Sequence, residues 1–284
     1  MKPAIFSKLF DDRSLEDAIL AAADIGYDGL EIMARDPHLP HGTSHERAAE
    51  LAELLSEHDV SVPCLATYTG GYSRKSDEEC EAELEKLEAF LELSQILDVD
   101  VLRHGPGGPS IGEATDDHVE RAATWLRKAA DLAAAYNRTI AIEIHANRLS
   151  ETTDATLRLL ELIDRENVGV IHDAGNMFLV DDPYGPESIE KLDDRLVHVH
   201  YKDISRIDDR SVSDAFTVSS DSDAAIFRRE CLGDGDIDYE LVFDALAERG
   251  YDGHLTTETF VSRIDPEAVA RRELSAFEQL VVDG

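Results

Sequence analysis

Short apolar segments alternate with longer amphipathic segments along nearly the whole chain, and this alternation predicts the fold. The short segments have the length of strands, in which side chains alternate faces. The long segments repeat apolar residues at helical spacing, and the first runs from the capping residue Ser14 to Gly26. The predicted strands are residues 4–7, 30–33, 60–66, 99–104, 139–145, 168–173, 196–201 and 253–258.

Eight such strand–helix pairs predict an α/β protein, a single (β/α)8 TIM barrel formed by residues 1–284. Regular alternation of strands and helices implies a parallel sheet. An open doubly wound sheet is the alternative, but it ordinarily has a glycine-rich phosphate loop after its first strand, and Ser7-Lys8-Leu9-Phe10 is not one. The one oversized connection, residues 203–238, is predicted to be a long loop on the active-site side.

The chain is strongly acidic, with 61 Asp and Glu residues against 27 Lys and Arg residues and a formal net charge of −34. The acids are spread along the chain, so a docking face for a basic partner is the weaker interpretation. An acidic surface repels itself unless salt screens it, and the charge therefore predicts a halophilic protein. It also argues against a nucleic-acid partner, because phosphate backbones are bound through Lys and Arg.

The sequence predicts a soluble cytoplasmic protein without a membrane partner. Met1-Lys2-Pro3 leads straight into a strand, and no apolar segment approaches the ~20 residues that span a bilayer. The cysteines, Cys64, Cys80 and Cys231, are odd in number and far apart, which favours a reducing compartment.

Four predicted strands in the second half of the chain end on a residue that can bind a hard divalent metal ion. These residues are Glu143, Asp173, His200 and Glu258. Their outward neighbours are mostly apolar, so strand parity places all four side chains inside the barrel. The carboxyl ends of barrel strands meet at the active-site mouth, where we expect the four to converge.

A bound cation is the simplest explanation for such a cluster, because converging acids otherwise repel each other or bind protons. Carboxylates with one imidazole suit one Mn²⁺, Mg²⁺ or Co²⁺ ion, with Zn²⁺ as an alternative. A structural role is the competing interpretation, above all for Asp173, which is placed to cap the following helix. His198 is predicted to be a hydrogen-bonded core histidine.

Several motifs resemble the xylose isomerase-like barrel superfamily, and together they cover essentially the whole chain. That superfamily includes sugar epimerases and isomerases, inosose dehydratases, hydroxypyruvate isomerases and apurinic endonucleases. The motifs are Tyr27-Asp28-Gly29-Leu30-Glu31, Ile142-Glu143, His172-Asp173-Ala174-Gly175-Asn176, His198-Val199-His200-Tyr201-Lys202-Asp203, Gly233-Asp234-Gly235-Asp236-Ile237-Asp238 and Gly250-Tyr251-Asp252-Gly253 followed by Glu258.

By position, the resemblance implies that the four strand-end residues hold one metal ion, as in ketose 3-epimerases, and that Arg206 binds substrate. The chain departs from the epimerases at two positions that contact substrate there. Leu149 stands in place of a glutamate and Asn176 in place of a histidine. The apurinic endonucleases need further histidines for three zinc ions, and Asn176 replaces one of them.

The predicted function is that of a divalent-metal-dependent isomerase or epimerase acting on a sugar, sugar phosphate or polyol. Glu143 and Glu258 are the predicted acid–base residues, which move a proton through a metal-stabilised enediolate. An inosose-type dehydratase or a hydroxypyruvate isomerase is the alternative. An apurinic endonuclease-like phosphodiesterase and a non-catalytic metabolite-binding barrel are less favoured. The resemblance also favours a homodimer or homotetramer.

Other polar residues near the strand ends are predicted to contact substrate. Lys202 and Arg206 are expected to bind substrate oxygens or a phosphate, with a surface salt bridge as the alternative for each. Glu31 and His104 end two strands, and His145 lies two residues beyond Glu143. These three are predicted to form walls of the pocket.

Overall fold

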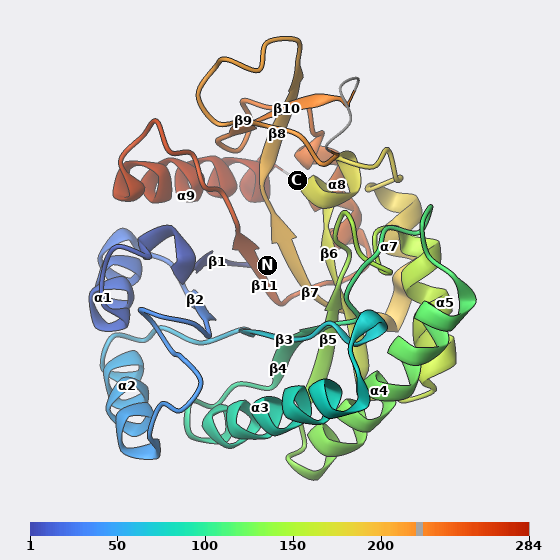
Figure 1. Cartoon of the computed structure of the whole chain (residues 1–284). Coiled ribbons are helices and arrows are strands. Elements are labelled where there is room, and N and C mark those ends of the chain that lie inside the picture. The colour runs from blue at the N-terminus through green and yellow to red at the C-terminus, as the bar shows by residue number, and fades with distance from the viewer. Residues whose placement is uncertain (220–223, 284) are drawn as a thin grey trace.

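A closed barrel of parallel strands surrounded by helices forms the molecule, as predicted (Figure 1). The computed structural model describes residues 1–219 and 224–283. In this part of the chain, eight strands close the barrel in the order β1-β11-β7-β6-β5-β4-β3-β2. All neighbouring pairs are parallel, which brings their carboxyl ends to one mouth.

The observed elements follow the predicted alternation closely. The strands are β1 Lys2–Phe6, β2 Gly29–Met33, β3 Leu65–Gly70, β4 Val101–Gly105, β5 Thr139–Glu143, β6 Val168–Asp173, β7 Leu196–Tyr201, β8 Asp203–Ile207, β9 Ala215–Phe216, β10 Ile226–Glu230 and β11 His254–Thr257. The α-helices are α1 Leu15–Ile25, α2 His45–Glu57, α3 Asp77–Ile96, α4 Asp116–Ala135, α5 Thr153–Ile163, α6 Ala174–Phe178, α7 Pro186–Leu192, α8 Tyr239–Glu248 and α9 Pro266–Asp283. The 3-10 helices are η1 Ser7–Phe10, η2 Tyr72–Arg74 and η3 Asp193–Arg195.

Capping residues fix where the helices begin and end. The Ser14 hydroxyl accepts a hydrogen bond from the Asp17 amide, and Gly26 ends α1 in the left-handed conformation at φ 108°. Ser76 and Glu79 form a reciprocal capping box at the start of α3. These local signals explain why the helix bounds could be predicted well.

The third strand is displaced from its predicted position. It was expected over residues 60–66 and is observed at Leu65–Gly70. Pro63 has no amide hydrogen to donate to a ladder, so regular pairing begins only after it. The displacement moves the mouth end of β3 to Tyr68, Thr69 and Gly70, where it borders the site described below.

An apolar layer fills the barrel beneath its polar mouth. Cys64, Ala141 and Ile171 form its buried core, with Val101 and Val197 packed against them. The outward faces of the strands pack under the helices in a large cluster of aliphatic and aromatic side chains. Because this apolar layer fills the interior, the polar side chains inside the barrel lie above it, at the carboxyl ends of the strands.

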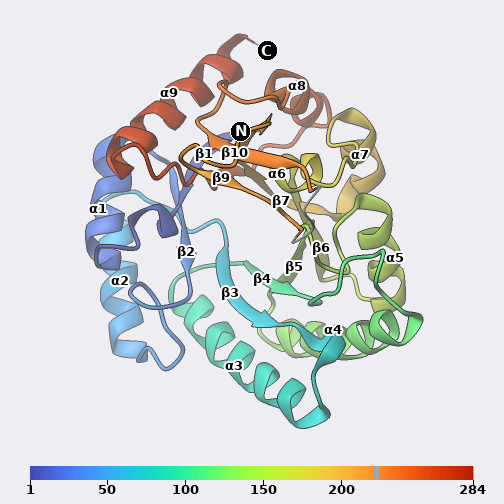
Figure 2. The same cartoon turned by 45° about the horizontal axis from the view of Figure 1, so that its top comes forward.

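The segment predicted as a long loop is partly folded, which corrects that prediction. Residues 203–238 contain the antiparallel sheet β8-β10-β9, whose three strands are labelled in Figure 1 and of which β9 and β10 are labelled in Figure 2. Residues 220–223 lie outside the described part of the chain. Asp203 links the beginning of the segment to its end, because its Oδ2 accepts hydrogen bonds at 2.9 Å from the amides of Gly233 and Gly235. A Cβ atom at position 235 would lie 2.0 Å from Asp203 Oδ1, so only glycine fits there.

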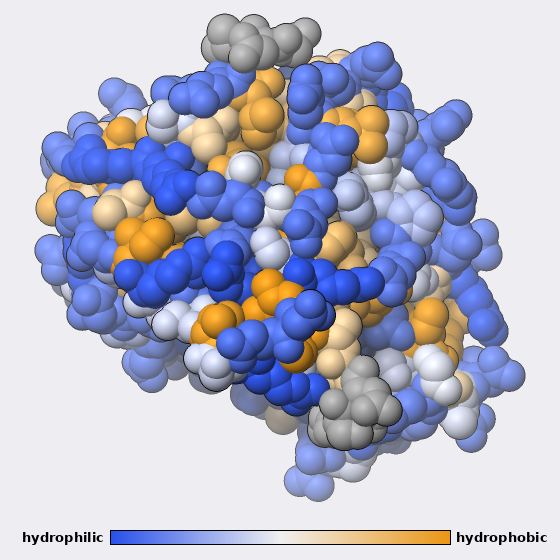
Figure 3. All heavy atoms as spheres, turned by 90° about the horizontal axis from the view of Figure 1, so that it is seen from above, coloured by the Kyte–Doolittle hydropathy of each residue, from blue (hydrophilic) through white to orange (hydrophobic). Residues whose placement is uncertain are grey.

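The surface is predominantly hydrophilic, as Figure 3 shows for one face, where hydrophobic residues appear scattered among polar ones. Within the described residues, the helices include none that is both long and apolar enough to cross a bilayer.

Candidate metal centre at the barrel mouth

The structure brings the four predicted strand-end residues together. Glu143 ends β5, Asp173 ends β6, His200 lies near the end of β7, and Glu258 directly follows β11. One ligand atom from each residue lies within 4.8 Å of those of the other three, and all four residues are buried. Three carboxylates and one imidazole at such separations form a donor set that fits a divalent cation.

Asp173 caps a helix and also belongs to the candidate metal-binding cluster, so the two roles that were predicted as alternatives are compatible. Its Oδ1 accepts a hydrogen bond of 2.8 Å from the Asn176 amide and so caps α6. Its Oδ2 faces the cluster, 2.7 Å from the Nζ atom of Lys202. Capping α6 therefore fixes the orientation of the carboxylate and directs Oδ2 toward the cluster.

Two basic side chains already neutralise part of the acidic cluster. Lys202 Nζ lies 3.0 Å from Glu258 Oε2, in addition to its contact with Asp173. Arg103 Nη1 lies 3.0 Å from Glu143 Oε2 and 3.3 Å from Glu258 Oε1. The repulsion argument for a metal ion is therefore weaker than the sequence suggested, and the arrangement of donor atoms carries the case.

Arg103 was missed by sequence reasoning, although strand parity could have identified it. Val101 of β4 packs in the apolar layer inside the barrel, and Arg103 follows two residues later on the same face. His104, which was predicted to be a pocket wall, therefore points outward. It is buried among Thr69 and Tyr72, with Nδ1 2.7 Å from Thr69 Oγ1 and Nε2 2.8 Å from the Tyr72 hydroxyl.

The mixed charges shift the protonation of the cluster in opposite directions. Burial opposes ionisation of Glu143, but Arg103 and His200 outweigh it and hold the pKa of Glu143 well below its usual range. At Asp173 burial dominates and raises the pKa, despite the nearby Lys202. Burial also opposes the charged form of Lys202, but Asp173 and Glu258 prevail and raise its pKa.

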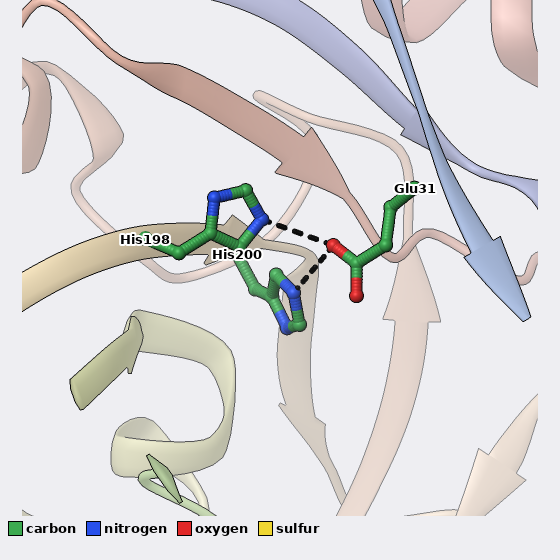
Figure 4. A group of neighbouring side chains, drawn as sticks. All are labelled: Glu31, His198 and His200. Atoms are coloured by element: carbon green, nitrogen blue, oxygen red, sulfur yellow. Dashed lines mark hydrogen bonds and ion pairs between the residues drawn. The ribbon is translucent and has the colours of Figure 1, made fainter. Parts of the chain in front are cut away.

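Glu31 lies beneath this cluster and contacts two histidines of β7 (Figure 4). Its Oε2 lies 2.9 Å from His200 Nε2 and 3.0 Å from His198 Nε2. His200 thus donates from Nε2 to Glu31, which leaves Nδ1, 3.3 Å from Glu143 Oε1, facing the acids. Glu31 was predicted to be a pocket wall, but it is fully buried and lines neither cavity described below. His198 is a hydrogen-bonded core histidine, as predicted.

The two positions at which the chain departs from the epimerases are both buried, although Asn176 also borders one of the two cavities described below. Asn176 is buried, and its Nδ2 donates to Asp173 Oδ2 at 2.9 Å and to Glu143 Oε1 at 3.3 Å. Leu149 is buried in the aliphatic cluster outside the barrel. Asn176 therefore ties two candidate ligands together, and Leu149 offers no polar group to a substrate.

Two cavities flank the cluster at the barrel mouth. One, of about 300 Å³, is bordered by Lys202, Glu258 and the small sheet of the 203–238 segment. The other, of about 750 Å³, lies over β3, β4 and β5 and is bordered by Arg103 and Glu143. His145, as predicted, lines both. A substrate in either cavity would reach a carboxylate of the cluster.

Arg206 does not line either cavity, which corrects its predicted position. It is exposed on β8 and pairs with Asp181, with Nη2 2.9 Å from Oδ1. The surface salt bridge weighed as an alternative is the arrangement observed. Lys8 and Arg229 border the smaller cavity instead, and neither was singled out from the sequence. Burial lowers the pKa of Lys8.

The fold and the donor set define a TIM barrel with a candidate metal centre at the carboxyl ends of its strands. The family model for the xylose isomerase-like TIM barrel matches residues 19–280, and the chain belongs to this family.

Relatives and structural neighbours add detail to this assignment. An inosose dehydratase of Lacticaseibacillus casei is 25% identical over 90% of this chain and 84% of its own length. The IOLI protein, whose crystal structure contains a zinc atom, superimposes with a TM-score of 0.81 at 19% identity, covering 100% of this chain and 99% of the other. An L-ribulose 3-epimerase superimposes with a TM-score of 0.78 at 20% identity over 99% and 95% of the two chains. The two structures share the fold with this chain.

Proposed function

We propose that this protein is a divalent-metal-dependent enzyme that removes a proton from the carbon next to a carbonyl group in a polyhydroxylated substrate. The observation that carries the proposal is the buried set of Glu143, Asp173, His200 and Glu258 between two cavities at the barrel mouth. A bound Mn²⁺, Mg²⁺, Co²⁺ or Zn²⁺ ion would act as a Lewis acid toward the carbonyl and an adjacent hydroxyl.

The chain's own residues supply the proton transfer. Glu143 and Glu258 come from β5 and from the end of β11, and each borders a different cavity. One carboxylate can therefore take the proton while the other returns or relays it. Lys202, 3.0 Å from Glu258 Oε2, is placed to hold a substrate oxygen beside that carboxylate.

The fate of the proton determines the reaction class. Return to the opposite face of the same carbon gives an epimerase, and return to the neighbouring carbon gives an isomerase, the functions predicted from the sequence. Loss of a hydroxyl group from the next carbon gives a dehydratase. We favour dehydration of an inosose-like polyol ketone, because three of the curated relatives that match most of the chain are inosose dehydratases. In addition, Leu149 and Asn176 stand where the epimerases have a glutamate and a histidine.

Incubation of the metal-loaded protein with inososes and ketoses in D₂O tests both outcomes. A dehydratase yields a product lighter by one water, whereas an isomerase or epimerase yields a product of the same composition that carries deuterium. We expect Glu143→Gln to reduce turnover by about 10²-fold or more, since a general base contributes roughly 10²–10⁴-fold.

The matched control is Glu151→Gln, because Glu151 is also buried beside β5 but hydrogen-bonds the loop amides of Ile111 and Asn147. Wild-type turnover in Glu143→Gln would show that the acid–base assignment is wrong. If the wild-type protein exchanges no substrate protons across the panel, the enzymatic proposal fails as a whole.

A further inference from the structure

The larger cavity at the mouth is basic, although the protein as a whole is strongly acidic. Five basic side chains border it, from the loops and strand ends of β2 to β5: Arg35, Arg74, Lys75, Arg103 and Arg148. The acidic residues in its lining are Glu113 and Glu143, and Glu143 is paired with Arg103. The cavity thus concentrates positive charge beside the candidate metal centre.

Three of these arginines have no acidic partner. Within the described residues, no carboxylate oxygen lies within 4.0 Å of a side-chain nitrogen of Arg35, Arg74 or Arg148. Most arginines elsewhere on this acid-rich surface form ion pairs, for example Arg158 with Asp116 and Arg271 with Asp24. Unpaired guanidinium groups that share one cavity are free to bind an anion, and their planar shape suits carboxylate or phosphate oxygens.

The aromatic ring that supports this cavity is held in a strained conformation. Tyr68 has a φ of 55°, which is rare for a bulky residue, and it lies where the pairing of β3 with β4 shifts register. Its ring centroid is 3.6 Å from the Cζ atom of Arg35 and 4.9 Å from that of Arg103. The ring thereby orders an unpaired arginine next to the one that contacts Glu143 and Glu258.

Several glycines border one side of the cavity. Gly70 and Gly71 lie at and just after the end of β3, and Gly105, Gly107 and Gly108 lie at and after the end of β4. A Cβ atom at position 70 would lie 2.3 Å from the Gly105 carbonyl oxygen, so a side chain there would collide with the end of β4. Because glycines have no side chains, this side of the cavity stays open beside the arginines.

We propose that this cavity binds an anionic oxygen group of the substrate, a carboxylate or a phosphate, while the polyol part reaches the metal-binding cluster. The inference rests on the proposed function as an enzyme that removes a proton next to a carbonyl group. It changes the preferred substrate from a neutral inosose-like ketone to a polyol ketone that also carries an acidic group. It also explains how a protein of net charge −34 holds an anion, since the local bases reverse the sign of the charge at the mouth.

Binding to metal-free protein tests this charge preference without relying on catalysis. Three probes share one polyol skeleton: glucitol is neutral, gluconate carries a carboxylate, and glucitol 6-phosphate carries a phosphate. They are titrated calorimetrically at low ionic strength after the chelator is removed by gel filtration, because the chelator is itself a polycarboxylate. We expect at least one anionic probe to bind about tenfold more tightly than glucitol.

Arg35, Arg74 and Arg148 are exposed, so Arg35→Ser, Arg74→Ser and Arg148→Ser should each reduce that preference by about threefold to fivefold, the upper end for an exposed charge pair. Arg271→Ser on α9 makes the same change in net charge away from the cavity and should leave the preference intact. A preference for gluconate assigns a carboxylate site, and one for glucitol 6-phosphate assigns a phosphate site; either supports the proposal.

Equal affinity for all three probes would overturn the proposal. So would a loss of anion preference in Arg271→Ser as large as the loss in the three cavity variants. The result is separable from the proposed function. Proton exchange on neutral polyols without an anion preference leaves the function standing and removes this site. Anion binding without any proton exchange leaves the anion site standing and removes the proposed function.

Discussion

The orientation of His200 depends on one buried carboxylate beneath it. Glu31 accepts a hydrogen bond from His200 Nε2, and this contact sets which ring nitrogen faces Glu143 and Glu258. Groups behind a ligating histidine commonly contribute 10–100-fold to metal affinity. Glu31, although buried away from both cavities, should therefore influence metal binding directly.

We expect Glu31→Gln to weaken Mn²⁺ binding by about 10–100-fold. The amide still fits the space but no longer offers a charged acceptor to both histidines. Equilibrium dialysis with Mn²⁺ measures the effect. Glu273→Gln is the matched control, since Glu273 is equally buried but lies on α9 outside the barrel. Unchanged affinity in Glu31→Gln would show that His200 is not held for metal binding.

Strand parity predicted the four cluster residues. It was not applied to β4, and Arg103 was missed for that reason. The four strand-end residues alternate with apolar outward neighbours, so their inward direction could be inferred from the sequence. On β4, His104 was predicted to form a wall of the pocket, but the side chain that points into the barrel is that of its neighbour Arg103. The links of Glu31 to β7 are contacts between residues 167 and 169 positions apart, and no local pattern predicts them.

At the scale of elements, α9 is joined to the barrel through a buried acid. Glu273 accepts hydrogen bonds from the Leu232 amide at 2.8 Å and from the hydroxyls of Thr257 and Thr259 at 3.0 and 2.9 Å. Burial outweighs these donors and raises its pKa to about 7. Below about pH 7 the folded protein therefore holds Glu273 in its protonated form.

The sign of the pH dependence follows from this raised pKa. An unfolded glutamate has a pKa of ~4.3, so the folded state binds the proton more tightly between that value and about 7. Stability from this site is present at low pH and is lost as pH rises through about 7. We expect wild type to lose about 2 kcal/mol relative to Glu273→Gln between roughly pH 5.5 and pH 8.

Urea unfolding of the metal-free proteins at each pH measures this difference. Glu278→Gln, an exposed change on the same helix, should keep a constant offset from wild type to within about 0.5 kcal/mol. A difference between wild type and Glu273→Gln that does not vary with pH would contradict the assignment.

The elements themselves were predictable to different degrees for physical reasons. Helices with side-chain caps and strands with apolar runs carry local signals, and these appear at or near their predicted positions. The sheet β8-β10-β9 does not, because β9 has only two residues, too few to show the alternation of a strand. The displacement of β3 likewise depends on Pro63 and on pairing with β4, which alternation alone does not reveal.

At the scale of the whole molecule, the excess of acidic residues should make stability depend on salt. A net charge of −34 on one barrel produces self-repulsion that unfolding relieves. The Debye length falls from roughly 14 Å at about 0.05 M to about 4 Å at about 0.5 M monovalent salt, so repulsion between surface carboxylates is screened across this range. We expect the thermal midpoint of the metal-free protein to rise by several degrees over the same range of KCl.

A calorimetric series in KCl and NaCl checks this, with sucrose at matched osmolality as the control for solvent exclusion. Screening predicts equal increases in both salts, with most of the rise below about 0.5 M, because the Debye length changes little above it. An increase that depends on the cation would instead indicate specific ion binding at acidic sites. A midpoint that stays flat or falls with salt would show that local ion pairs, such as Arg165 with Asp131 and Arg121 with Asp77, already compensate the acidic surface.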